Sequence, residues 1–137
     1  MENKKFEKES VDQIMNKGFE SAGMEGFDGS YSLSSVQKGV SLLEKLKSGL
    51  IDKKLAVMTE FCEAFSIWYG NYITSLFKAE WMEDFRGEAI IWLFNNWVID
   101  PFEEVFDYVY GPSHKHLLLE RLDPANYKNH GLRPRNN

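Results

Sequence analysis

Cysteine is nearly absent from the sequence, since Cys62 is the only one in 137 residues. An internal disulfide is therefore impossible, and a zinc site built from several cysteines is excluded as well. Cys62 lies in an apolar helical run between aromatic and acidic neighbours, which disfavour the thiolate that a nucleophilic cysteine needs. We therefore expect a small buried hydrophobe at this position, in a protein of a reducing compartment.

Long apolar runs are missing too. The most apolar stretch, Ala89 to Ile99, has eleven residues and includes Asn95 and Asn96, whereas a membrane-spanning helix needs about 20. Met1 to Ser10 is charged, and it is not followed by the apolar segment of a signal peptide. These features predict a cytoplasmic protein that does not enter the membrane.

The sequence lacks the common motifs of metal, nucleophilic and phosphate chemistry. It contains no Glu-x-x-His, no His-Glu-x-x-His, no Gly-x-Ser-x-Gly and no phosphate-binding glycine loop. His114 and His116 fall at an expected helix start, where side chains two positions apart diverge. Carboxylate pairs such as Glu60 and Glu63 occur at helical spacing, and such pairs mostly form a solvated face. We therefore expect a protein that is not an enzyme and that holds no metal and no cofactor.

Basic residues are scarce in the middle of the chain. From Asp52 to Tyr110 there are eleven acidic residues and four basic ones, a local net charge of −7, whereas the whole chain carries −5. Affinity for nucleic-acid phosphates comes largely from Lys and Arg, so direct binding to nucleic acid is disfavoured. An acidic centre favours a protein partner with a basic surface.

Apolar residues at intervals of three and four predict helices along most of the chain. The expected ranges are Val11 to about Ala22, a segment capped by Ser34 or Ser35 that runs to about Ser48, Asp52 to about Leu76, Glu88 to Ile99, Pro101 to about Tyr110, and Ser113 to Asp123. The clearest boundary is Asp100-Pro101-Phe102-Glu103, which combines a capping carboxylate with a proline at the first helical position.

Two of these helices carry further expectations. Gly70 lies inside the Asp52–Leu76 helix at a cost of about 1 kcal/mol relative to alanine, and it predicts a kink or a close helix–helix crossing. The segment Glu88 to Ile99 is apolar nearly all round, as a central buried helix would be, although so short a run is also compatible with a strand.

The sequence thus predicts an all-α fold, a compact bundle of five to six helices in one domain over residues 1–123. A short strand or hairpin near residues 26–34 is the alternative to a loop that leads into a helix there. Residues 124–137, rich in Asn, Lys, Arg and Pro, predict a polar, basic tail.

Fifteen of the twenty aromatic residues fall between Phe61 and Tyr110. Most of them are expected in the core, but Trp81 stands among charges, and aromatic residues rimmed by acids are typical of protein-binding surfaces. The predicted partner-binding residues are Glu80, Trp81, Glu83, Asp84, Glu103, Glu104 and Asp107. The leading hypothesis is a small acidic protein that docks on a partner protein and inhibits it, as small acidic phage proteins often do with host enzymes.

Two other functions remain open at the level of sequence. In one, the surplus aromatic residues close a symmetric interface in a homo-oligomeric structural or assembly protein. In the other, Trp68, Tyr72, Trp92 and Trp97 line a pocket for a small ligand or substrate, which Asn95 or Asn96 orients.

Overall fold

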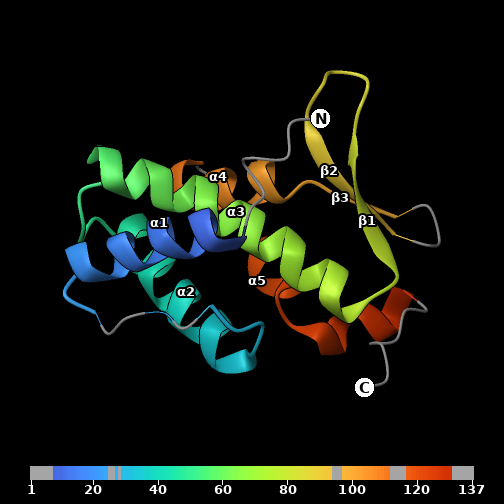
Figure 1. Cartoon of the computed structure of the whole chain (residues 1–137), viewed down its shortest axis with the longest axis horizontal. Helices are drawn as coiled ribbons and strands as arrows, with labels where there is room; N and C mark the ends of the chain where they lie inside the picture. The colour runs from blue at the N-terminus through green and yellow to red at the C-terminus, as the bar shows by residue number, and fades with distance from the viewer. Residues whose placement is uncertain (1–7, 25–26, 28, 94–96, 112–116, 131–137) are drawn as a thin grey trace.

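The computed structural model describes residues 8–24, 27, 29–93, 97–111 and 117–130 (Figure 1). The helices are α1 (Lys8–Ser21), α2 (Leu33–Lys47), α3 (Ala56–Leu76), α4 (Pro101–Tyr110), α5 (Leu117–Arg121) and the 3₁₀ helix η2 (Pro124–His130). The strands are β1 (Ala79–Glu83), β2 (Ala89–Leu93) and β3 (Val98–Ile99). The prediction of a mainly helical fold is therefore confirmed, with a small antiparallel sheet as its minor part.

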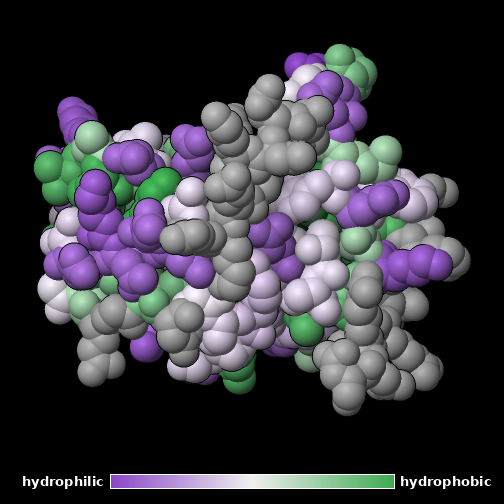
Figure 2. All heavy atoms as spheres, viewed as in Figure 1, coloured by the Kyte–Doolittle hydropathy of each residue, from purple (hydrophilic) through white to green (hydrophobic). Residues whose placement is uncertain are grey.

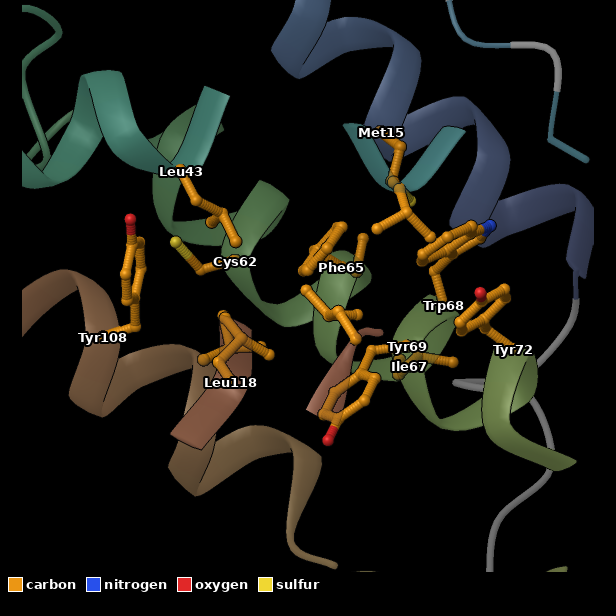
Figure 3. Close-up of a cluster of buried hydrophobic side chains, with 14 of the residues drawn as sticks. Met15, Leu43, Cys62, Phe65, Ile67, Trp68, Tyr69, Tyr72, Tyr108 and Leu118 are labelled. Atoms are coloured by element: carbon orange, nitrogen blue, oxygen red, sulfur yellow. The ribbon is translucent and has the colours of Figure 1, made fainter. Parts of the chain in front are cut away.

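The helix α3 forms the centre of the molecule, with α1 and α4 packed against it. Every residue from Ala64 to Gly70 is buried, so this part of the helix is covered on all sides, as its wide apolar stripe predicts. The ring of Trp68 stacks on Phe65 and on Tyr72, with centroids 5.5 Å and 5.3 Å apart (Figure 3). Aromatic side chains thus supply much of the core, as expected.

The helix ends follow from local capping groups. Asp100 accepts a hydrogen bond from the Glu103 N–H at 3.1 Å, with proline at the start of α4, as predicted. The cap of α2 is Ser32, which accepts from the Ser35 N–H, rather than Ser34 or Ser35. Asp52 does not begin α3, because its carboxylate instead accepts the Lys54 N–H in a turn that precedes the helix.

The predicted helix over Glu88 to Ile99 is wrong. This stretch contains β2 and β3, which with β1 form an antiparallel sheet in the order β1-β2-β3. The stretch is apolar on both sides because Ile91, Leu93 and Ile99 are buried, while Ile90 and Trp92 on the other face are half-buried. By contrast, the described residues 27 and 29–34, where a strand was considered, contain none.

The C-terminal part of the domain extends beyond Asp123. Tyr127 in η2 is completely buried, and its ring stacks on Phe77 with centroids 4.4 Å apart. The expected boundary between domain and tail therefore falls inside the packed part of the chain, whereas residues 131–137 of the expected tail lie outside the described residues. Within the described ranges, no helix has both the length and the apolar character to cross a membrane.

Candidate functional site

The hairpin of β1 and β2 projects from the helical body and ends in a tight turn (Figure 1). The Gly87 N–H donates to the Asp84 carbonyl at 3.0 Å, and the Asp84 N–H donates to the Glu88 carbonyl at 2.9 Å. Gly87 has φ of 81°, in the left-handed region that a three-residue hairpin loop requires at this position. The residues Asp84 to Gly87 therefore form a turn that only glycine closes without strain.

The Asp84 side chain fixes this turn from within. Its carboxylate accepts the backbone N–H groups of Arg86 and Glu88 at 2.8 and 2.9 Å, and it also binds the Arg86 guanidinium at 2.9 Å. These bonds, above all the one from the Glu88 backbone, lower the pKa of Asp84. The predicted site residue Asp84 is thus occupied in holding the turn.

Phe85 lies at the crest of the turn and is 97% exposed. Its only described ring contact is with the Arg86 guanidinium, 5.8 Å from the ring centroid. In the space-filling view, hydrophobic and hydrophilic spheres lie side by side on this projection (Figure 2). The interpretation of the sequence did not single out Phe85, although Asp-Phe-Arg-Gly is a recognisable turn sequence that would place it at the tip.

The side chain of Trp81 on β1 points toward the helices. Its indole N–H donates to the Asn71 side-chain oxygen at 2.8 Å, and its ring lies 6.4 Å from that of Phe102. The ring also covers Gly70, where an added Cβ would come within 2.0 Å of it. Gly70 therefore marks a close approach, as predicted, but to a strand residue rather than to another helix. Trp81 anchors the hairpin to α3 and is only partly accessible to a partner.

The outer face of the sheet carries a different set of side chains. In the register, Glu80 lies opposite Trp92, Met82 opposite Ile90, and Trp92 opposite Val98. Because strand residues alternate between faces, these side chains all point away from buried Ile91. Met82 and Val98 are 42% and 43% exposed. Glu80 thus lies beside Trp92 on the outer face of the sheet, and not on the face that carries Trp81.

On the inner side, a hollow of about 490 Å³ separates the hairpin from the start of α4. The described residues that line it are Arg86, Gly87, Glu88, Ala89, Asp100, Phe102 and Glu103. The Arg86 guanidinium lies 3.0 Å from the Glu88 carboxylate and 3.9 Å from that of Asp100. Arg86 is therefore neutralised by its neighbours, and the rim of the hollow is acidic.

Glu104 does not belong to this surface, contrary to the prediction. It is 9% exposed, accepts a hydrogen bond from Tyr69 at 2.8 Å and pairs with Arg121 at 2.5 Å. Burial raises the pKa of Glu104, and the positive charge of Arg121 opposes this rise. The guanidinium of Arg121 also lies 5.1 Å from the ring centroid of Trp97. Glu104 therefore joins α5 to the core.

The remaining predicted residues lie at the margins. Glu103 and Asp107 are exposed on α4 one turn apart, and Glu103 lines the hollow. Glu83 is exposed at the end of β1, opposite Ala89, which also lines the hollow. The structure thus brings Glu83 and Glu103 to one side of the hairpin, and places Glu80 on the other.

Among the hollows lined by described residues, none brings together the four aromatic residues of the expected ligand pocket. Trp68 and Tyr72 stack within the core, Trp92 lies on the outer face of the sheet, and Trp97 contacts Tyr127, 5.1 Å away. Of the hollows of about 490, 250 and 140 Å³, only the smallest includes one of them, Trp97. Asn95 and Asn96, which were expected to orient a ligand, lie outside the described residues.

Cys62 is the one cysteine of the chain, and its surroundings are apolar. Cys62 is fully buried, as expected, and burial raises its pKa to about 12, so the thiol stays protonated at neutral pH. In the part of the chain that the structure describes, no three His, Cys, Asp or Glu side chains are grouped so that they could hold a metal ion. His114 and His116 lie outside that part.

Comparison of the chain with protein-family models, with curated proteins and with solved structures gives no match. The geometry of the hairpin and of α4 is therefore the basis for any functional conclusion.

Proposed function

We propose that this protein is a binding protein that docks on a partner protein with a basic surface, through the β1–β2 hairpin and the first turns of α4. The observation that carries the proposal is the hollow between these two elements. Among the described residues that line it, Glu88, Asp100 and Glu103 are acidic, and the cation among them, Arg86, is already paired. Such a rim attracts Lys and Arg side chains of another protein.

The charge of the whole central segment supports this proposal. Its net charge of −7 creates a field that steers a basic partner and repels nucleic acid. Exposed carboxylates mainly increase the rate at which a basic partner associates. This increase is smaller at high salt, because ions screen the charges. Capture of a basic partner should therefore weaken as salt increases. If the basic surface of the partner is its functional groove, this protein would block the groove and so inhibit the partner.

The experiment is affinity purification from a lysate of the native host at low and high salt, with a charge-reversed variant. Glu103→Lys with Asp107→Lys should reduce capture at low salt about tenfold or more, because cations replace one carboxylate that lines the hollow and a second one turn further along α4. The matched control is Glu60→Lys with Glu63→Lys, which reverses two exposed acids on α3. Equal capture by the two variants would refute the proposal.

A homo-oligomeric assembly protein is the second candidate, because Met82 and Val98 on the outer sheet face are more than 40% exposed. In that case these side chains would be covered by a second copy. Light scattering at several protein concentrations distinguishes the two functions, because it measures the molecular mass in solution. A protein that stays monomeric at every concentration would refute the assembly function.

A further inference from the structure

We propose that Phe85 is the anchor of the docking surface, and that its ring enters an apolar pocket on a partner protein whose rim carries Lys or Arg. This inference rests on the proposed function and deepens it, because it names the residue that enters the partner and the chemistry of the pocket. It is carried by the exposure of the ring, the rigidity of the turn, the apolar face behind it and the charges around it.

The first observation is the position of the ring. At 97% exposure, Phe85 is more exposed than any other large hydrophobic side chain that the structure describes. It stands at the end of a projecting hairpin, so it can enter a concave site without a collision between the two protein bodies. Aromatic side chains that fill a pocket are the usual hot spots of protein interfaces.

The second observation is that the turn is built before any partner arrives. The Asp84 carboxylate holds the backbone of Arg86 and of Glu88, and Gly87 closes the turn in the left-handed conformation. At its base the hairpin is attached to α3 through the bond from Trp81 to Asn71. An anchor presented in a fixed position loses little conformational entropy on binding.

The third observation is the apolar face of the sheet from which the hairpin tip projects. The cross-strand pairs Met82–Ile90 and Trp92–Val98 lie on one face of the hairpin and its neighbour strand. Met82 and Val98 are the most accessible of the four. An aromatic tip with an apolar strip behind it has the composition of an interface core.

The charges around the hairpin turn indicate which kind of partner binds Phe85. Glu83 and Glu88 flank the turn and Glu80 lies on the apolar face, whereas the Arg86 charge is compensated by Asp84 and Glu88. A second copy of this chain would bring the same carboxylates face to face, where they repel. An anionic lipid surface would be repelled as well. A protein pocket with a basic rim is complementary to both the ring and the carboxylates.

The test uses the photo-crosslinking amino acid p-benzoylphenylalanine at position 85 of the full chain, irradiated in a lysate of the native host. The control carries the same group at position 50. Leu50 is 78% exposed and precedes the 21-residue α3, whereas the hairpin follows this helix. The expected result is a crosslink from position 85 but not from position 50, to a partner peptide that combines apolar residues with Lys or Arg.

Competition with unlabelled protein makes the result specific. Wild-type protein and Leu50→Ser should suppress the crosslink equally, whereas Phe85→Ser should need about 30-fold higher concentration, as expected for a hot-spot residue. Because Phe85 is exposed, the Phe85→Ser variant should have the same Tm as the wild-type protein. Equal competition by Phe85→Ser and wild type overturns the inference, and so does a crosslink to a second copy of the chain.

The two proposals fail in different ways. If Phe85→Ser captures the partner as well as wild type does, while Glu103→Lys with Asp107→Lys loses it, the charged surface stands and the Phe85 anchor is refuted. If no protein is captured by wild type at either salt concentration, the proposed function itself is refuted, and the anchor with it.

Discussion

Gly70→Ala is the substitution that best tests how the hairpin is attached to the helical body. Alanine favours a helix more than glycine does, by about 1 kcal/mol, so a helical glycine is normally improved by this change. Here the new Cβ would lie 2.0 Å and 2.4 Å from two carbons of the Trp81 ring. Non-bonded carbon atoms do not approach so closely, so the ring or the strand has to move.

The expected net effect is a loss of stability. Overpacking of a well-filled contact costs about 1–3 kcal/mol, and a displaced indole also loses its hydrogen bond to Asn71, which contributes about 0.5–1.5 kcal/mol. After the gain in helix propensity is subtracted, Gly70→Ala should lower the free energy of unfolding by about 1–3 kcal/mol. For a domain of this length, each kcal/mol corresponds to a fall in Tm of roughly 3–5 °C.

The decisive comparison is the same substitution in the Trp81→Ala background. There the obstructing ring is gone, so Gly70→Ala should stabilise the protein by about 1 kcal/mol, and its effect changes sign. The double-mutant cycle should thus give a coupling energy of about 2–4 kcal/mol.

Urea unfolding, followed by circular dichroism, measures the free energy of unfolding of all four proteins. The values are comparable if the m value is the same in all of them. Stabilisation by Gly70→Ala in the wild-type background, or an equal effect in both backgrounds, would refute the packing of Trp81 on α3.

Two further predictions concern buried groups. Tyr127→Ala should lower the free energy of unfolding by about 3–5 kcal/mol, because the ring is fully buried against Phe77. Urea unfolding measures this change. An unchanged stability would mean that residues from Pro124 onward are a tail. Burial raises the folded-state pKa of Glu104, so the folded protein holds this proton more tightly than the unfolded chain. Wild type should therefore lose stability relative to Glu104→Gln as the pH rises above the ordinary pKa of a glutamate, and a constant difference between the two proteins across that range would contradict this.

The candidate site could be predicted from the sequence only in part. The acidic character of the region and the unusual setting of Trp81 among charges are visible in the sequence. Glu103 and Glu104 are neighbours of the same type in one helix, and the interpretation of the sequence placed both on the partner-binding surface. Glu104, however, lies three positions after Pro101 and four before Tyr108, on the buried face of α4. Its partners there, Tyr69 on α3 and Arg121 on α5, come from segments distant in sequence.

The features that depend on neighbours a few positions away could be predicted from the sequence alone. The start of α4 at Asp100-Pro101 and the periodicity of α3 were predicted from such neighbours, because capping and helical spacing act within one or two turns.

The sheet formed by β1, β2 and β3, the role of Gly70 and the burial of Tyr127 could not be predicted in this way. Each depends on contacts between segments distant in sequence: Trp97 and Phe77 on Tyr127, and Trp81 on Gly70. A short apolar run fits a strand or a helix equally well until the surfaces that cover it are known.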